Sequence, residues 1–502
     1  MMTRSARLLA TVPLFFAALM LPLSFTGGVM TTPAIGHALG GSPLALMWLT
    51  NGFMLSFGGC LLGAGVAADK LGSRRLFFSG LLLFVVSCGL IGVAQSTWVV
   101  GGLRTLQGLA AALTLAAAAT ALAQLYEGAA RTRAFSLLGT LFGLGLAFGP
   151  LLIGVLTQHG SWRWVYVVLA LMAGLSLLWA LRFLVVASPA VTERADWRGI
   201  TLFTAALMLF SVALLLLPEQ GMFAWPVAML FALSLLLAVV FVRHCQRHPA
   251  PVFQLQLLRQ PRFAGVLVLP VATCYCYVVL LIVIPLHFMG MQGMDEIDSA
   301  LWLLALTSPM LVVPMLAALL TRWFSAGGIA VAGLLLAALG LLGLSFAVAG
   351  PWVLFAMFVI GCGAALPWGL MDGLAVSAVP LSQAGMAAGL FNTVRVAGEG
   401  IALALVVALL VALNHLTLGH ALPESDPQAL SAAANWLGSS NLAQARLALP
   451  EVDLTLILSS YQQAWQGLLW LLAAITLLTA VGVWLLLVSK NTTAVEQVQQ
   501  VP

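Results

Sequence analysis

Two ionisable side chains stand within one long apolar stretch, residues 385–412. Arg395 and Glu399 are four residues apart, so a helix would present both on one face. Removal from water favours the protonated form of a carboxyl group, whereas a neighbouring arginine favours the ionised form. Such a group could exchange a proton for a substrate, and we favour this interpretation. The alternative is a buried ion pair that only fixes helix packing.

Two further charged residues lie in other apolar stretches. Arg104 stands in the stretch 98–122, where a charge is costly unless it faces an interior partner or a water-filled cavity. The alternative for Arg104 is an extended side chain that reaches the membrane surface. Asp372 lies near the end of the stretch 351–374, beside Trp368. It is either a second titrating group or an ordinary helix-end carboxylate, and the sequence leaves both open.

The composition identifies the scaffold of these side chains as a membrane protein. Of the 502 residues, 62% are hydrophobic and only 7% are charged, whereas soluble domains carry about 25% charged residues. Apolar stretches of about twenty residues follow one another, and each is long enough to cross the hydrocarbon core of a bilayer. We predict an all-α protein with spans near residues 8–32, 46–68, 76–95, 98–122, 133–156, 164–186, 200–217, 223–243, 264–288, 299–320, 328–348, 351–374, 385–412 and 464–488.

The distribution of charge predicts the orientation in the membrane. Most of the 20 lysine and arginine residues fall in alternate loops, and the other loops carry acidic residues instead. Because cytoplasmic loops are rich in basic residues, we expect both termini to be cytoplasmic, in a bacterial inner membrane. The basic residues are scattered singly between apolar stretches, so no nucleic-acid partner is expected. We expect the lipid bilayer to surround the predicted helices.

The connection after the second predicted span carries glycines, an acid and two arginines at fixed spacing. It reads G-x-x-x-D-x-x-G-x-R-R, with Gly65, Asp69, Gly72, Arg74 and Arg75. The glycines permit a tight turn and close helix approach, and the aspartate could pair with a cation or cap the next helix. The arginines are expected to face the cytoplasm and anionic lipid headgroups.

The fifth predicted span is rich in small residues. It contains Gly145, Gly149 and Pro150, which form a G-x-x-x-G-P pattern. Small residues at this spacing permit two helices to cross closely, and a proline bends the helix that contains it. Considered alone, the pattern predicts a packing seam between helices.

Together these patterns resemble the major facilitator superfamily, and within it the branch of fourteen-span drug:proton antiporters. The glycine- and arginine-rich connection looks like the family's signature loop. Arg104 and Gln107 belong to an R-x-x-Q-G sequence that looks like its second motif, whose arginine is associated with proton transfer. The fifth span resembles the antiporter motif that marks exporters. The span with Arg395 and Glu399 is similar to the corresponding span of these antiporters.

The resemblance implies the major facilitator fold, with two six-helix bundles and two extra central spans. Such folds transport by rocking one bundle against the other around a midplane site. We therefore expect a bundle at 1–190, two linker spans with a cytoplasmic connection at 191–263, and a second bundle at 264–502. The long polar connection 414–463 is expected outside. Its heptad-like apolar residues indicate a short amphipathic hairpin that lies on the membrane. An inert loop is the favoured interpretation for its role, and a lid over the outer mouth is the alternative.

One departure from the family pattern affects the expected proton path. The comparable antiporters carry an aspartate in the first span, and alignment on Pro33 puts Ser24 at that position. The first span contains no acid at all. Proton coupling would therefore have to depend on Glu399 and on Asp372.

These features predict a secondary transporter that exports small amphipathic or cationic molecules in exchange for protons. The alternatives are a dedicated exporter of one metabolite or siderophore and, less favoured, a proton symporter for uptake. No catalytic set, phosphate loop or metal-ligand spacing stands out, so we predict no enzyme, no cofactor and no metal site. The need for a periplasmic adaptor is left open. Polar and aromatic residues within the spans are candidates for lining the cavity, namely Asn51, Gln107, Tyr275, Tyr277, Trp302, Trp368 and Asn392.

Overall fold

The computed structural model describes residues 4–185, 196–221, 224–248, 251, 255–347, 350–379 and 384–488. The predicted domain boundary between residues 190 and 191 lies outside these ranges. Within them the chain forms helices and no strand.

Fourteen helical segments of the described ranges are long and apolar enough to cross a membrane, which confirms the predicted number. Each predicted span overlaps one of them. Those formed by one helix are α1 (Arg4–Leu39), α2 (Pro43–Leu71), α3 (Ser73–Val93), α4 (Thr97–Leu125), α5 (Gly128–Gln158), α6 (Trp162–Phe183), α7 (Trp197–Gln220), α8 (Trp225–Arg247), α14 (Ala326–Phe346), α15 (Pro351–Ser377) and α16 (Ala384–Ala421).

The remaining spans change helix type along their length. The ninth consists of α10 (Pro261–Thr273), the π-helical turn η1 (Cys274–Val278) and α11 (Leu280–Met291). The tenth consists of α12 (Glu296–Thr307), the 3₁₀ turn η2 (Ser308–Leu311) and α13 (Val313–Leu320), and the last joins α19 (Leu454–Val483) to the π-helical turn η4 (Trp484–Val488). Prolines accompany the first two changes, because a proline has no N–H to continue the helical hydrogen bonds. Pro270 precedes η1, and Pro309 lies in η2.

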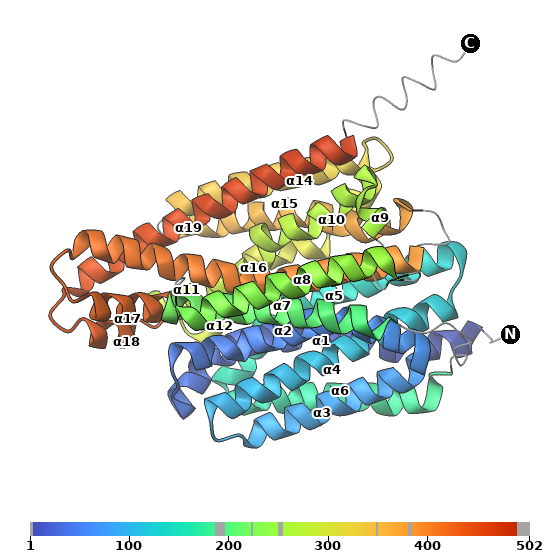
Figure 1. Ribbon diagram of the computed structural model, residues 1–502, viewed down its shortest axis with the longest axis horizontal. Coiled ribbons are helices and arrows are strands. Elements are labelled where there is room, and N and C mark those ends of the chain that lie inside the picture. The colour runs from blue at the N-terminus through green and yellow to red at the C-terminus, as the bar shows by residue number, and fades with distance from the viewer. Residues whose placement is uncertain are drawn as a thin grey trace, which may run out of the picture.

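The first six helices form one bundle, which lies in the lower part of Figure 1. In it α1 packs on α5 and α6, α2 packs on α4, and α3 packs on α4 and α6. The second bundle contains the spans from α10 to α19, with α15 against α14 and α19 against both α14 and α16. The bundles meet where α2 packs on α16 and where α5 packs on α12.

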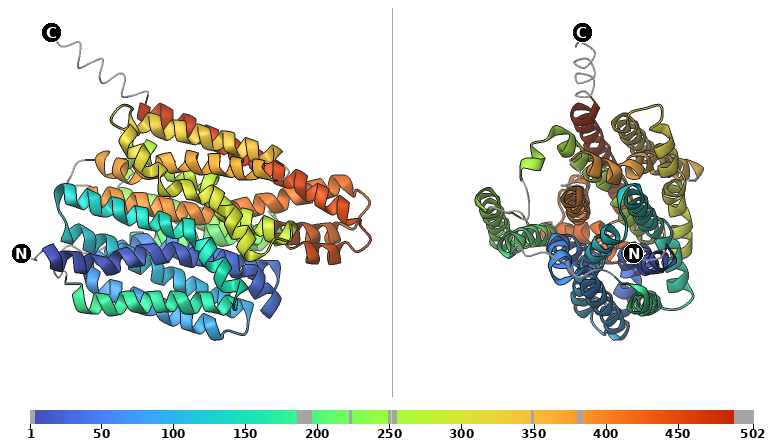
Figure 2. Two further views of the ribbon diagram at one scale, coloured as in Figure 1. Left: turned by 180° about the vertical axis from the view of Figure 1, so that it is seen from behind. Right: turned by 90° about the vertical axis from the view of Figure 1, so that its right-hand side faces the viewer.

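The two extra spans lie at the side of the molecule, although they are central in the sequence. Helix α7 packs on α2 and α16, and α8 packs on α7. The end-on view in Figure 2 shows this green pair at one side of the molecule. A short helix, α9 (Leu255–Leu258), follows before the second bundle begins.

The two ends of the molecule, along its helices, differ in the elements that lie there. Helix α1 begins and η4 ends at one end, here called the terminal end (Figure 1). At the opposite, far end lie α17 (Pro427–Gly438) and α18 (Leu442–Ala448). The predicted polar connection is therefore largely helical, because α16 continues to Ala421 and α19 begins at Leu454. Leu430 and Leu437 of α17 are buried, and α17 packs on α16.

Close packing in the second bundle depends on Gly340 of α14. A Cβ atom there would lie 2.8 Å from the backbone nitrogen of Ile360 in α15, closer than real Cβ contacts come. At Gly343, three residues further along the same helix, the nearest atom would be 3.7 Å away, an ordinary contact. The two glycines therefore form a matched pair for a test of packing.

We expect Gly340→Ala to lower the free energy of unfolding by about 1–3 kcal/mol, the usual cost of overpacking. Gly343→Ala should leave it unchanged or raise it slightly, because alanine loses less backbone entropy than glycine on folding. Thermal unfolding of both purified variants in one detergent checks this. Equal melting temperatures would contradict the expectation.

Candidate functional site

A charged cluster joins α15 and α16 inside the second bundle. Arg395 of α16 is 6% exposed, and its Nη1 donates to both carboxylate oxygens of Asp372 of α15 at 3.4 Å. Its Nη2 donates to Oδ1 of Asn392 at 2.6 Å. The guanidinium carbon also lies 5.6 Å from the ring centroid of Phe142 and 5.7 Å from that of Phe391. Arg395 is thus a buried cation whose counter-ion is Asp372.

Glu399 lies one turn further along α16 and is not part of this ion pair. It is 4% exposed, and its Oε1 has no hydrogen-bond partner in the described part of the chain. Arg395 forms its ion pair with Asp372 instead. Arg395 and the thiol of Cys274 are nonetheless near enough to interact with Glu399 electrostatically. Cys274 begins the π-helical turn η1, and such turns are frequent at functional sites.

This cluster lies where the two bundles meet. A Cβ atom on Gly58 of α2 would lie 2.7 Å from the Cα of Ala397 of α16, so the two backbones are in contact there. A Cβ atom on Gly139 of α5 would lie 3.5 Å from Oδ2 of Asp372. A change in the charge of the cluster would therefore act at the contact between the bundles.

Arg104 forms a second buried cationic site, in the first bundle. Its side chain is fully buried, its Nε donates to the carbonyl of Leu49 at 3.0 Å, and its Nη1 donates to Ser24 Oγ at 3.1 Å. Nη1 also donates to Oε1 of Gln107. The ring centroid of Phe53 lies 4.4 Å from the guanidinium carbon. The side chain of Arg104 therefore points into the bundle and does not reach the membrane surface.

The acceptors around Arg104 are all uncharged. Its Nη2 is buried without a hydrogen-bond partner among the described residues. A Cβ atom on Gly28 of α1 would overlap the guanidinium, so a glycine is needed where α1 passes this side chain. Ser24, the residue at the position of the family's aspartate, thus contacts the arginine directly but brings no negative charge.

We expect Ser24→Asp to supply a counter-ion for Arg104, whose acceptors among the described residues are uncharged. A buried charge without a counter-ion is strongly destabilising. The free energy of unfolding of Ser24→Asp should therefore exceed that of Ser24→Asn by about 1 kcal/mol or more, although both larger side chains crowd the site. Ser24→Asn is the control, because it adds the same bulk without the charge. Thermal unfolding of both variants measures the difference. A melting temperature for Ser24→Asp at or below that of Ser24→Asn would contradict the expectation.

A cavity of about 450 Å³ lies between the two bundles at the far end. Helices α1, α2, α11 and α16 line it, together with the turn between α17 and α18. None of the described lining residues is Asp, Glu, Lys or Arg. A mostly apolar wall with a few polar groups suits an uncharged or amphipathic small molecule. The polar side chains in the wall are Thr32, His37, Thr50, Asn51, Trp436, Ser439, Ser440, Asn441 and Gln444.

Three of the polar residues indicated by the sequence take different places around these sites. Asn51 lines the cavity, and its buried Oδ1 has no partner within the described ranges. Gln107 instead accepts a hydrogen bond from Arg104, and Asn392 accepts one from Arg395. Two of the three residues therefore orient buried arginines and do not face the far-end cavity.

The indicated aromatic residues belong to the second bundle, in which Tyr277 and Trp368 are buried. The ring of Tyr277 packs edge-on against Trp368 with centroids 6.0 Å apart, and Trp302 packs edge-on against Phe288 at 5.6 Å. Tyr275, in the π-helical turn η1, is half-buried. None of these four rings lines the far-end cavity.

The two glycines of the signature-like loop behave differently. Gly72 lies between α2 and α3 with a φ of +95°, a conformation that L side chains rarely adopt. A Cβ atom on Gly65 would meet no atom within 4 Å, so Gly65 is not a point of close helix approach in this conformation. The tight turn expected from the sequence is therefore at Gly72 alone.

The charged residues of this loop make weak surface contacts. Oδ1 of Asp69 accepts a hydrogen bond from Thr120 Oγ1 of α4 at 3.4 Å. Asp69 does not cap α3, whose N-cap is Gly72. Arg74 donates to the carbonyl of Leu181 at 3.5 Å, and Arg75 is exposed. These hydrogen bonds link α2 to α4 and α3 to α6 at the terminal end.

The small residues of the fifth span lie against α1. A Cβ atom on Gly145 would overlap the carbonyl oxygen of Leu19, and one on Gly149 would overlap Oγ1 of Thr26. Pro150 follows within the same helix, and α5 continues past it to Gln158. The glycines therefore permit the close crossing of α1 and α5.

Several contacts of these sites carry no sequence signal. The carbonyl of Leu49 and the ring of Phe53 hold Arg104, but an apolar residue in a span gives no sign of that role. His37 and Asn441 line the far-end cavity, yet in the sequence they are indistinguishable from ordinary polar residues at helix ends. The recurring apolar residues of the connection 414–463 indicated an amphipathic hairpin, but they gave no sign that it lines the cavity between the bundles.

Known proteins of similar sequence are named for resistance and export. The Tetracenomycin C resistance and export protein of Streptomyces glaucescens is 28% identical over 399 residues, which are 78% of this chain and 74% of that protein. The Multidrug resistance protein Stp of Mycobacterium tuberculosis is 26% identical over 377 residues, 74% of this chain and 70% of that protein.

Solved structures of low sequence identity share the fold. A bacterial homologue of the human lysosomal transporter Spinster superposes with a TM-score of 0.64 at 12% identity, covering 96% of this chain and 97% of that one. A mutant of the peptide transporter POT gives a TM-score of 0.61 at 14% identity, with 95% of each chain covered. Residues 14–403 match the family described as Major Facilitator Superfamily. The chain is therefore a multi-pass membrane transporter that belongs to the major facilitator superfamily.

Proposed function

We propose that this transporter exports small amphipathic or cationic molecules in exchange for protons. The observation that carries the proposal is Glu399, a buried carboxyl with an open hydrogen-bond position, one turn from the Arg395–Asp372 ion pair. An ionisable group inside a membrane-spanning bundle is costly and is typically functional. The export and resistance activities in the names of two relatives support the outward direction.

In this proposal Glu399 is the proton carrier and Asp372 is the fixed counter-ion of Arg395. Protonation removes a negative charge from the stretch of α16 that contacts α2 near Gly58. Neutral side chains tolerate the dry contact between bundles better than charged ones. The protonated and ionised forms would therefore favour different arrangements of the two bundles, which is the requirement for coupling.

The excess of basic residues in alternate loops supports an inner-membrane orientation with both termini in the cytoplasm. The terminal end would then face the cytoplasm, and the far-end cavity would face the periplasm. Its uncharged wall is compatible with neutral amphipathic cargo and with cations whose charge remains near water.

Accumulation of fluorescent dyes in an efflux-deficient bacterial host tests the cargo class. Cells that express the transporter should hold less of several unrelated amphipathic dyes than cells that express Glu399→Gln. Equal accumulation of every dye would contradict export of such compounds.

A dedicated exporter of one metabolite or siderophore is the second candidate. The uncharged surroundings of Arg104, with Ser24 in contact, favour it, because the chain lacks the first-span acid of the comparable drug antiporters. Release of a single endogenous product, measured by mass spectrometry of the medium in the presence and absence of the transporter, would support this candidate over dye export.

A further inference from the structure

A polar cluster outside the transport path joins the terminal ends of the two extra helices. Asp196 is the N-cap of α7, His244 lies in the last turn of α8, and His248 is the C-cap of α8. The two histidines are four residues apart, which places them on one side of the helix end. Asp196 lies 48 residues from His244 in the sequence, so only the fold brings the three side chains together.

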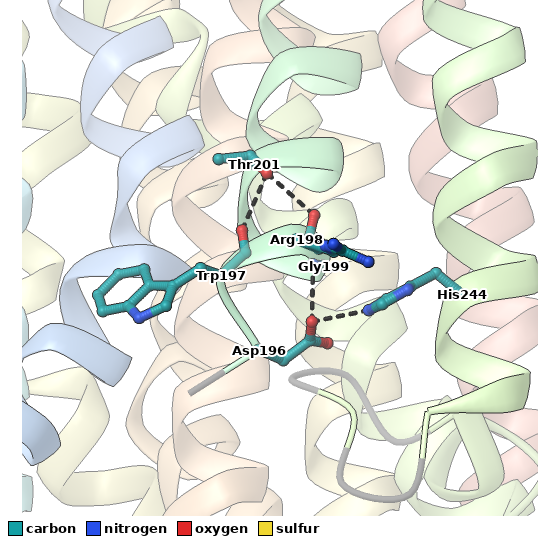
Figure 3. A network of polar contacts seen from close by, with 6 residues as sticks. All are labelled: Asp196, Trp197, Arg198, Gly199, Thr201 and His244. Carbon is teal, nitrogen blue, oxygen red and sulfur yellow. Dashed lines mark hydrogen bonds and ion pairs between the residues drawn. The ribbon is translucent and has the colours of Figure 1, made fainter. Parts of the chain in front are cut away.

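The donor atoms of the cluster converge. His244 Nε2 lies 2.7 Å from Asp196 Oδ1, and the imidazole centroids of His244 and His248 are 5.1 Å apart. One ligand atom from each of the three residues lies within 4.8 Å of the other two. Figure 3 shows Asp196 and His244 directed toward each other from different helices. The three side chains would therefore need to move little to bind one ion together.

We propose that Asp196, His244 and His248 form a binding site for a divalent transition-metal ion of the Zn²⁺ type. Two imidazoles and one carboxylate are a typical zinc ligand set, completed by water at the fourth position. With metal–ligand bonds of about 2.0–2.1 Å, tetrahedral donors stand about 3.4 Å apart. The Asp196–His244 separation of 2.7 Å is shorter than that value, so His244 must move slightly outward, and the ligand atom of His248 already lies within 4.8 Å of both others.

The carboxylate of Asp196 is already oriented for this role. Its Oδ1 accepts the backbone N–H of Gly199 at 2.8 Å, as expected of a helix N-cap, and its side chain is only 2% exposed (Figure 3). A fixed outer hydrogen bond of this kind orients a metal ligand. His244 is 20% exposed, which leaves an entry path from the solvent.

The neighbouring charges do not prevent cation binding. Arg198, Arg243 and Arg247 lie close to the cluster in sequence but are exposed, so water and salt screen their repulsion. The carboxylate supplies one negative charge, and neutral imidazoles add none. Zinc-type ions, which prefer nitrogen ligands, are therefore favoured over Mg²⁺ and Ca²⁺, which prefer sets of oxygen ligands.

Metal binding would fasten α8 to α7 at the terminal end. Helix α8 packs on α7, and many of its other side chains are exposed, so its position depends mainly on its contact with α7. A ligand that binds only the folded form raises its stability in proportion to the logarithm of its concentration. This site is independent of the proposed transport activity, and its test requires no transported substrate.

Equilibrium dialysis of the full chain in detergent tests the proposal. The protein carries a purification tag without histidine, is stripped with a chelator, and is then titrated with Zn²⁺ and, separately, with Co²⁺. We expect one high-affinity ion per chain and a Co²⁺ absorption spectrum typical of a four-coordinate site. Mg²⁺ at the same concentration should not compete.

His248→Ala is the decisive variant, because it leaves the Asp196–His244 contact intact and so preserves the fold. We expect it to weaken Zn²⁺ binding by about tenfold or more. His420→Ala, an exposed histidine at the far end of α16, is the matched control and should bind like the parent protein. Absence of Zn²⁺ binding by the parent protein, or equal binding by His248→Ala and the parent, would overturn the proposal and leave an ion pair between Asp196 and His244 alone.

Discussion

Replacement of Glu399 by glutamine is expected to abolish transport driven by a pH gradient. Glutamine keeps the size and polarity of the side chain but cannot release a proton, so one of the two charge states of the cycle is lost. We expect the initial rate of gradient-driven substrate movement in proteoliposomes to fall by about tenfold or more. Exchange of labelled for unlabelled substrate requires no net proton movement and should persist.

The persistence of exchange separates loss of coupling from loss of folding. Glu451→Gln, at an exposed position in the far-end connection, is the matched control and should transport like the parent protein. Gradient-driven transport that survives Glu399→Gln would assign Glu399 a structural role and leave Asp372 as the remaining candidate for the proton carrier.

Replacement of Asp372 by asparagine is expected to destabilise the second bundle. It leaves the guanidinium of Arg395 buried without its counter-ion, with Asn392 as its remaining hydrogen-bond acceptor among the described residues. Loss of one partner of a fully buried pair costs about 3–5 kcal/mol. Because the side chain of Asp372 is 33% exposed, we expect a smaller loss, about 2 kcal/mol in the free energy of unfolding. Thermal unfolding in detergent measures it.

A second substitution shows whether the unpaired charge is the cause. The double variant Asp372→Asn with Arg395→Met no longer buries the guanidinium that Asp372 balanced, so it should be more stable than Asp372→Asn alone. Asp298→Asn, an exposed position in the first turn of α12, controls for the general effect of removing a carboxylate. A double variant less stable than Asp372→Asn would show that Arg395 stabilises the bundle by packing and not as a charge with a counter-ion.

The positions of the spans could be predicted because the bilayer constrains each of them separately. A helix must be apolar over about twenty residues to cross, and this requirement is visible in the local sequence. The ends are less predictable, since a helix can continue into water without any apolar signal. Helix α16 extends to Ala421, beyond the predicted end at residue 412, through Asn414 and His415.

The partner of Arg395 could not be predicted, because it is a property of the packed bundle. Spacing along one helix favours Glu399, four residues away, but the ion pair forms with Asp372 of α15. The burial of Arg104 followed from the cost of a charge in a span, whereas its contact with Phe53 depends on how α2 and α4 pack. Sequence therefore identified the charged residues and not their contacts.

The far-end connection shows the same limit. Its polar residues favoured an inert loop, but the turn around Ser440 lines the cavity between the bundles. A Cβ atom on Gly290 of α11 would overlap the carbonyl oxygen of Ser440, so α11 and this turn are in contact. Whether a polar segment lies free or covers a cavity depends on the surface beneath it, which a single sequence does not display.

Transport by purified protein in proteoliposomes with an imposed pH gradient tests the central claim most directly. The substrate is the dye that the cell assay identifies, and its concentration inside the vesicles is followed by fluorescence. With an acidic lumen, outward proton flow should drive the dye inward, and a protonophore should abolish this accumulation. Accumulation that is unaffected by the gradient, or that occurs only when the external medium is the acidic side, would contradict proton antiport.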